Sequence, residues 1–347
     1  MGRKDRAWRG IWLNMVALGV FLLALPLFFR MGGGIFAVGE MLPGQAAAVA
    51  FFPIPTEEET KPLIDSDGVE FTQKQAISAG GRPLWVTEEE LGRMQEADYL
   101  RRNYYIVDSR TALLSEDVDV PEALGLDLTI PPSQTEPKIL IFHTHAHEGY
   151  ADSDMSKGLS EGIWGVGEEL KRILEEEYGI AVLHDDGQYD MVNGKGQTTG
   201  AYERMEPPIR ALLEKYPSIE VCIDLHRDGV PEGTRLVAEV DGELCAQVMF
   251  FNGLCRLNKN GTPQPIAGLE NPYLKENLAF SLQMKTAADA LYPSFARKIY
   301  LNAYRFSLHM LPRSTLIEVG AQTNTKAEAR KAMQPLAEIL AKTLLEG

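Results

Sequence analysis

The stretch of residues 138–148 reads KILIFHTHAHE. Its apolar part, residues 139–142, has no polar interruption, which is typical of a strand that is covered on both faces. Three histidines and one glutamate then follow within residues 143–148. The stretch therefore predicts a buried strand of a parallel sheet, with chemically active side chains just beyond its carboxyl end.

The alternation of apolar strands with amphipathic helices continues to the C-terminus. A turn is expected at Asp241-Gly242, and the last helix opens at Thr325 with a capping-box pattern. Strands that alternate with helices predict an α/β fold with a mostly parallel sheet flanked by helices. The predicted elements are helices at 163–174, 210–216 and 277–291, strands at 180–183, 219–225 and 316–319, and a hairpin at 235–252.

The N-terminus is opposite in charge to the rest of the chain. The 347 residues hold 34 Lys and Arg against 49 Asp and Glu, a formal charge of −15. Residues 1–30 contain five basic residues and one acid, a net charge of +4 that leaves −19 on the remainder. The acidic remainder lacks the basic footprint that engages phosphates, so nucleic-acid binding is not expected.

An apolar segment lies directly after the basic N-terminus. Residues 11–29 form an uncharged stretch of 19 residues, which as a helix nearly spans a hydrocarbon core of about 30 Å. The basic residues before it predict a cytoplasmic N-terminus and an extracytoplasmic remainder. A cleaved signal peptide is the alternative, but its apolar region is usually shorter. We therefore expect an uncleaved, single-pass anchor in the cell membrane.

Four regions are expected along the chain. Residues 1–30 form the cytoplasmic tip and transmembrane anchor, and residues 31–86 form a stalk that is largely polar in its second half. Residues 87–136 form a small accessory module that ends in a proline-rich linker. Residues 137–347 form the catalytic domain. The elements expected in the module are a helix at 88–102 and strands at 104–107 and 126–130.

Candidate metal ligands follow two of the predicted strands. His145 and Glu148 stand three residues apart after the strand at 139–142, and His226 follows the strand at 219–225. Two histidines and one carboxylate are common ligands of catalytic zinc, with a position left open for water. Because the carboxyl ends of parallel strands meet at one edge of a sheet, we expect the three side chains to converge.

The same strand ends carry candidates for proton transfer and charge stabilisation. Glu318, on a late predicted strand, is the candidate that takes a proton from water and returns it. Arg227 is the candidate for stabilising an oxyanion. Either Asp224 or Asp228 is expected to orient a ligand histidine from behind.

The residues singled out above resemble those of a known family. The blocks are 139–145 with Glu148, then 224–228, then 316–320 followed by Asn324-Thr325. In this order they resemble stage II sporulation protein P, a family of membrane-anchored cell-wall hydrolases of endospore-forming bacteria. The resemblance covers residues 137–347, and the N-terminal anchor in layout only.

The resemblance implies a zinc-dependent N-acetylmuramoyl-L-alanine amidase with a zinc-amidase-like fold, which also acts as an endopeptidase on cross-linked stem peptides. It implies zinc ligands at His145 and His226 and a catalytic carboxylate at Glu318. Glu148 is preferred as the third ligand because it stands in a shared block. Peptidoglycan is the implied substrate, and stage II sporulation proteins D and M are the implied partners in spore engulfment. The alternative third ligands are His143, His147, Glu161 and Glu168.

Two departures from the family and two competing functions remain open. His147 stands where the family more often has a small polar residue, and residues 304–307 replace an Asn-rich stretch, so substrate contacts on that side are not assigned. A zinc carboxypeptidase-like enzyme would use a similar ligand set, but it needs an arginine clamp that the sequence does not identify. A non-catalytic wall-binding scaffold with a vestigial metal site is the other alternative.

Overall fold

The computed structural model describes residues 30–31, 34–35, 75–79, 81 and 83–346. The chain divides into two units, Met1–Ala47 and Ala48–Gly347. The described residues of the first unit form a short antiparallel pair, β1 (Arg30–Met31) and β2 (Gly34–Ile35). The predicted anchor at residues 11–29 and most of the predicted stalk lie outside the described residues. Within the described part of the chain, no helix is long and apolar enough to cross a membrane.

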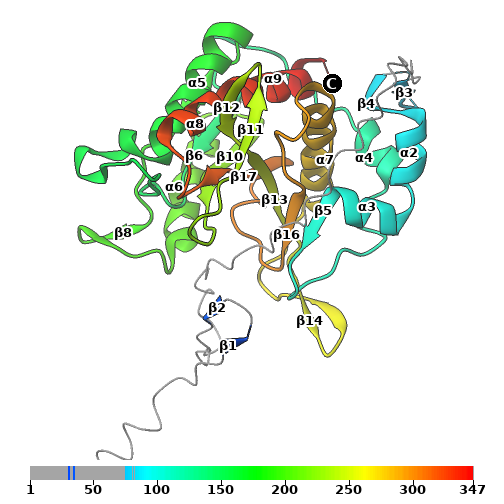
Figure 1. The fold of residues 1–347 in the computed structure, drawn as a ribbon, viewed down its shortest axis with the longest axis horizontal. Coiled ribbons are helices and arrows are strands. Elements are labelled where there is room, and N and C mark those ends of the chain that lie inside the picture. Colours follow the sequence, from blue (N-terminus) through cyan, green and yellow to red (C-terminus); the bar gives the residue numbers. More distant parts are fainter. Residues whose placement is uncertain (1–29, 32–33, 36–74, 80, 82, 347) are drawn as a thin grey trace, which may run out of the picture. The chain divides into compact units, whose positions relative to one another are not determined.

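A seven-stranded sheet forms the centre of the second unit (Figure 1). Its order is β5-β16-β13-β17-β10-β6-β7, and every neighbouring pair is parallel except β13 and β17. The predicted α/β fold with a mostly parallel sheet is therefore confirmed. The strands are β5 (Tyr105–Val107), β6 (Ile139–Phe142), β7 (Val182–His184), β10 (Val221–Asp228), β13 (Val248–Gly253), β16 (Ile299–Asn302) and β17 (Arg313–Ala321).

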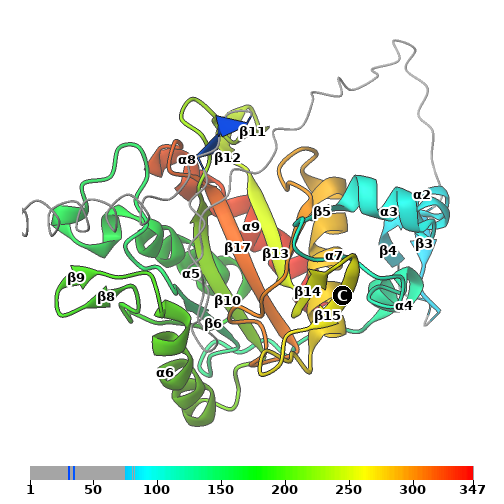
Figure 2. The ribbon, with the colours of Figure 1, turned by 90° about the horizontal axis from the view of Figure 1, so that it is seen from below.

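Helices pack on both faces of this sheet, as Figures 1 and 2 show. One face forms the largest apolar core with three helices of nine residues or more, and the other face packs against a single helix. The three helices are α5 (Ile163–Tyr178), α7 (Leu274–Leu291) and α9 (Met333–Ala341), and the single helix is α6 (Ala201–Lys215).

Side-chain alternation along the strands separates core residues from site residues. On β10, Ile223 and Leu225 pack into the core formed with α5, α7 and α9. Cys222 packs instead with α6 on the opposite face. Since successive side chains of a strand point to opposite faces, Asp224 and His226 lie on the α6 face with Cys222. The candidate residues of β10 are thus placed on the less completely helix-covered face.

Shorter elements surround the sheet. The short helices are α2 (Glu88–Met94), α3 (Ala97–Tyr104), α4 (Val120–Gly125) and α8 (Lys326–Lys331), with 3-10 turns η1 (Met155–Lys157) and η2 (Leu159–Glu161) and a π turn η3 (Lys342–Glu346). The two-stranded pairs are β3 (Gln75–Ile77) with β4 (Pro83–Thr87), β8 (Met191–Val192) with β9 (Lys195–Gly196), β11 (Val237–Val240) with β12 (Glu243–Ala246), and β14 (Arg256–Lys259) with β15 (Thr262–Pro265).

Two local predictions hold. Thr325 caps α8 in a capping box with Glu328. The hairpin turns at Asp241 and Gly242, whose φ angles of 52° and 78° suit a two-residue hairpin turn. The predicted hairpin was too long, however, because residues 248–253 leave it and join the central sheet as β13.

The region between residues 87 and 136 differs from its prediction in three ways. The single helix predicted at 88–102 is two helices, α2 and α3, separated near Gln95. The strand predicted at 126–130 is wrong: this segment follows α4, and its last residue, Ile130, donates its backbone N–H to Leu344 O. Residues 105–107 form a strand as predicted, but this strand pairs with β16 and is an edge of the central sheet.

Candidate metal centre

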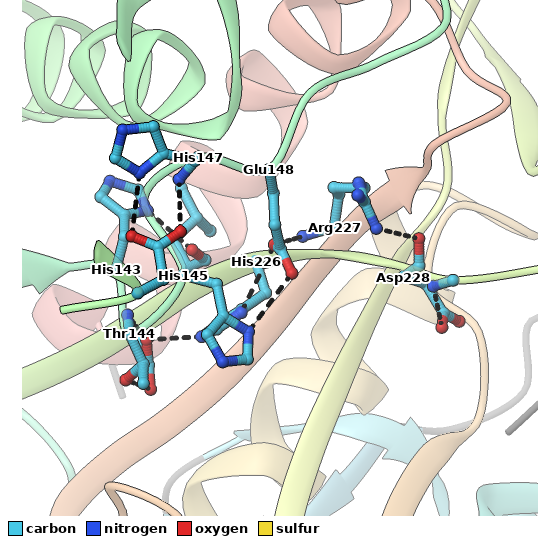
Figure 3. A network of polar contacts seen from close by, with 12 residues as sticks. His143, Thr144, His145, His147, Glu148, His226, Arg227 and Asp228 are labelled. Atoms are coloured by element: carbon cyan, nitrogen blue, oxygen red, sulfur yellow. Dashed lines mark hydrogen bonds and ion pairs between the residues drawn. The ribbon is translucent and has the colours of Figure 1, made fainter. Parts of the chain in front are cut away.

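The three predicted ligands lie together at the carboxyl ends of β6 and β10 (Figure 3). His145 Nδ1 is 3.5 Å from Glu148 Oε1, and His226 Nδ1 is 3.4 Å from Glu148 Oε2. One possible ligand atom from each of the three residues lies within 4.8 Å of the others. Across the described part of the chain, no other cluster of three or more His, Cys, Asp or Glu side chains meets this criterion.

The segment that carries Glu148 is held in place by close backbone contacts. After β6 ends at Phe142, the chain turns, and the backbone carbonyl of Glu148 accepts a hydrogen bond from Ile163 N at 2.9 Å. Gly162 lies against the same carbonyl, since a Cβ at this position would be 2.4 Å from Glu148 O. Only glycine permits this approach, which fixes the ligand segment to the start of α5.

The charges of the group suit a bound cation. Burial works to raise the pKa of the Glu148 carboxyl, but the facing His226 and His145 hold that pKa below its usual value. Glu148 Oε1 is nevertheless buried without a hydrogen-bond partner. A buried carboxylate oxygen left without a hydrogen bond, on a group that faces one imidazole with each oxygen, is costly in a folded protein unless a cation shares the space.

Asp224 orients His226. Its Oδ1 is 2.7 Å from His226 Nε2, so the other ring nitrogen, Nδ1, faces Glu148. Asp224 also accepts hydrogen bonds from Thr144 N and Oγ1, at 2.9 and 2.7 Å, and from Ser307 Oγ at 2.8 Å. Of the two aspartates considered from the sequence, Asp224 thus has the orienting position.

Asp228 has a different partner from Asp224. Its Oδ2 is 2.8 Å from Arg297 Nη1, and its Oδ1 accepts from Gly229 N at 2.7 Å. Asp228 therefore forms a buried ion pair with Arg297, which lies just before β16, and does not have the orienting position beside a ligand histidine.

Glu318 lies beside the ligand group on the next strand. It is in register with His226 across the β10–β17 ladder, so both side chains share one face. Its Oε2 is buried and has no hydrogen-bond partner. Burial, together with the negative charges of Asp228 and Glu148, raises the pKa of the Glu318 carboxyl well above its ordinary value. A carboxyl in this position has the basicity that proton transfer requires.

Arg227 is bonded to the backbone around the site. Its N–H donates to Glu148 Oε2 at 2.9 Å, which helps to fix that carboxylate. Its guanidinium donates to the backbone carbonyls of Gly149 and Asp228, at 3.0 and 3.3 Å, and Figure 3 shows it directed away from the two ligand histidines. The predicted oxyanion role of Arg227 stays a prediction, because its observed contacts are those of a loop-binding residue.

The alternative third ligands make contacts outside the ligand group. His147 Nδ1 is 2.9 Å from Asp190 Oδ1, and Glu161 pairs with Lys326. His143 Nδ1 is 2.7 Å from Leu225 O, and its Nε2 is 2.8 Å from His184 Nε2. His184 in turn is bonded to the fourth alternative, Glu168. Glu148 is therefore the acid that the structure brings to both ligand histidines.

Comparison with protein families finds a match that covers most of the chain. A family model described as stage II sporulation protein P (SpoIIP) matches residues 82–341, which is more than half of the chain. The chain belongs to the stage II sporulation protein P family. None of the curated proteins compared with it matches.

Comparison with solved structures finds several amidases of low sequence identity. The amidase AmiC2 of Nostoc punctiforme is 14% identical, with 62% of this chain and 97% of that chain covered and a TM-score of 0.34. The CwlD amidase of Clostridioides difficile, solved with the GerS lipoprotein, is 13% identical, with 59% and 98% covered and a TM-score of 0.36. The amidase Ami1 of Mycobacterium abscessus is 12% identical, with 60% and 99% covered and a TM-score of 0.33.

The sequence assigned no role to several residues that border the site in this SpoIIP family member. The ring of Tyr202, on α6, meets the His145 ring edge-on with centroids 5.9 Å apart. Ser307 reaches Asp224, and Phe306 meets Tyr202 at a centroid distance of 5.4 Å. These residues come from a helix start and a loop, where no periodic pattern marks them, so only the folded chain reveals their place.

Proposed function

We propose that this SpoIIP family member is a membrane-anchored peptidoglycan hydrolase that cleaves the amide bond between N-acetylmuramic acid and L-alanine during spore engulfment. The observation that carries the proposal is the buried cluster of His145, Glu148 and His226 with Glu318 in register beside it. Family membership supports the substrate. Cleavage of cross-linked stem peptides at the same site is proposed as a second activity.

Zinc is the proposed cofactor because two imidazole nitrogens and one carboxylate are a common ligand set of catalytic zinc. The buried Glu148 carboxylate, whose Oε1 has no hydrogen-bond partner and whose two oxygens each face one of the histidines, fits a cation held by these three residues. Held there, zinc would polarise the scissile carbonyl and lower the pKa of the attacking water.

The protein's own groups account for the remaining steps of amide hydrolysis. Glu318 takes the proton from the attacking water and returns it to the amine of L-alanine as the C–N bond breaks. Its buried Oε2 has no competing hydrogen-bond partner, so that atom is available for the transfer. Asp224 keeps the Nε2 side of His226 occupied, which leaves Nδ1 directed at the ligand group.

The test is the product pattern of the full-length chain, purified in detergent and incubated with peptidoglycan. Mass spectrometry should show stem peptides freed from the sugar with a new L-alanine N-terminus. Glu318→Gln and His226→Ala should each lower the rate by about 100-fold or more, whereas Arg172→Gln, on the exposed side of α5, should not. Release of single C-terminal residues would instead support the carboxypeptidase-like alternative, and undiminished activity in both site variants would overturn the assignment.

Anchoring and partners are further parts of the proposal. The uncharged segment at residues 11–29 supports a single-pass anchor with the catalytic region outside the cytoplasm. Fractionation should recover the full-length chain in the membrane, and a released chain lacking residues 1–45 would contradict this. Sporulation proteins D and M are the proposed partners, to be sought by co-purification from detergent-solubilised membranes.

A further inference from the structure

An aromatic wall extends from the metal-ligand group across the α6 face of the sheet. Tyr202 meets His145, Phe306 meets Tyr202, and Phe251 meets Phe306 at a centroid distance of 4.7 Å. Phe251 of β13 and Asp224 of β10 are each in register with Leu316 of β17 from opposite sides, so all three lie on one sheet face. The wall therefore borders the same surface that presents the ligand group.

The loop that contributes Phe306 is held in a strained conformation. Phe306 has a φ of 53°, which is unfavourable for a bulky aromatic residue. The loop is also pressed onto β13 at Gly253, where a Cβ would lie 1.9 Å from Tyr304 O. Strain of this kind persists only where surrounding contacts enforce it, and it concentrates at binding sites. The position of the residue before Phe306, Arg305, is fixed by the same contacts.

Arg305 belongs to a cluster in which one carboxylate is shared by several basic side chains. One carboxylate, Glu206 of α6, is contacted by Arg210 Nη2 at 2.8 Å, by His309 Nε2 at 2.9 Å and by Arg305 Nη2 at 3.2 Å. The Glu206 carboxylate is therefore shared by two guanidinium groups and an imidazole, so it is not reserved for Arg305.

The hydrogen-bonding capacity of Arg305 is incompletely used. Its bond to Glu206 is long, and its other bond, from Nη1 to Gly268 O, is 3.4 Å. Its Nε is buried without a hydrogen-bond partner. A guanidinium has five N–H donors in a planar arrangement that matches a carboxylate. An arginine with unused donors can therefore bind an anionic ligand.

Helix α6 connects this cluster to the ligand group. Glu206 stands four residues after Tyr202 on α6, a rise of about 6 Å along the helix, and Tyr202 itself contacts His145. An extended peptide advances about 3.4 Å per residue, so carboxylates two or three residues from a cleaved bond lie about 7–10 Å away from it.

We propose that Arg305 binds a free carboxylate of the stem peptide, two or three residues beyond the bond that is cut, with Tyr202 and Phe306 lining the path between. This inference rests on the proposed function and names the part of the substrate that the site selects. Binding of the carboxylate by Arg305 makes the enzyme specific for stem peptides whose side carboxylates are free rather than amidated.

The test compares two soluble muropeptides that differ only in whether the stem-peptide carboxylates are free or amidated, with the full-length protein as enzyme. The wild-type chain should prefer the free form by about 10-fold or more in kcat/KM, as expected for a charge-assisted pair. Arg305→Gln should abolish this preference by slowing only the free substrate. Arg305→Lys, which keeps the charge but not the fork, should restore part of it.

The outcomes separate this inference from the proposed function. Hydrolysis of both muropeptides at equal rates by the wild-type chain would overturn the role of Arg305 and leave the amidase proposal standing. Equal slowing of both substrates by Arg305→Gln would also overturn it, because a merely structural role predicts that result. No hydrolysis of either substrate, or of intact peptidoglycan, would instead overturn the proposed function. Arg172→Gln serves as the matched arginine control.

Discussion

Replacing Asp224 by asparagine tests how a ligand histidine is held. In the wild-type protein, Oδ1 faces Thr144 N and His226 Nε2, and Oδ2 faces the hydroxyls of Thr144 and Ser307. The amide oxygen of asparagine can retain the first two bonds. Its NH₂ group can donate to the two hydroxyls, because a hydroxyl accepts as well as donates. The substitution therefore keeps the geometry and removes the charge.

The expected size of the effect follows from the lost charge. A hydrogen bond to a charged group contributes about 1.5–3 kcal/mol, against about 1 kcal/mol for a neutral pair. Losing about 1–2 kcal/mol from the support of His226 corresponds to about 10-fold weaker metal binding, toward the low end of what outer-sphere partners of metal ligands contribute. By contrast, Asp224→Ala leaves four buried donors without an acceptor and is expected to prevent stable folding.

The assay is competition between the full-length protein and a chromophoric chelator for zinc. Asp224→Asn should weaken zinc binding by about 10-fold, and saturating zinc should recover most of the hydrolytic rate. Asp228→Asn is the matched control, because it changes a buried aspartate two residues away that contacts Arg297 rather than a histidine. It should change zinc affinity by less than about 3-fold. Wild-type affinity in Asp224→Asn, or an equal loss in both variants, would refute the orienting role.

Three further predictions concern the close contact between Gly162 and the Glu148 backbone, proton uptake by His143 on unfolding, and removal of the metal. Gly162→Ala should displace the Glu148 backbone, which costs about 1–3 kcal/mol of stability and lowers zinc affinity. Gly196→Ala is the control, because a Cβ there meets no atom within 4 Å, and it should change neither stability nor zinc affinity. Equal denaturation midpoints for the two variants would contradict the role of Gly162. Burial lowers the pKa of His143 to about 3 in the folded protein, so unfolding takes up a proton below pH about 6.5 and stability should fall by up to about 1.4 kcal/mol per pH unit between pH 6.5 and 3. Urea unfolding measures that slope, and His143→Asn should make it shallower. Chelation should lower the melting temperature by several degrees, since a ligand at 100 times its Kd stabilises the fold by about 2.7 kcal/mol, and Glu148→Gln should be insensitive to chelator.

The sequence was most informative where one pattern had one physical cause. The apolar run at residues 139–142 is buried on both faces, so its pattern predicted a strand, and β6 is that strand. The convergence of His145, Glu148 and His226 followed because parallel strands bring their carboxyl ends to one edge. The choice between Asp224 and Asp228 did not follow, because both lie on the same face of β10 and only their neighbours, Ser307 and Arg297, distinguish them.

Long-range pairing explains what the sequence did not reveal. The strand at residues 105–107 has only three residues, and its partner β16 lies almost two hundred positions later. No local pattern indicates such a partner, so a separate module was the simpler expectation. Phe306 reaches the border of the site through a loop whose course is set by contact with Gly253, and this course has no periodic signature.

The position of β5 at the edge of the central sheet also bears on how this protein can evolve. The segment that supplies β5 and the segment that supplies the ligand group complete one sheet, so natural recombination cannot exchange one without the other. A junction placed near residue 137 would leave β16 as an exposed edge, which invites aggregation. A segment inherited as one folding unit must therefore begin before β5. The family match begins at residue 82, which is upstream of β5.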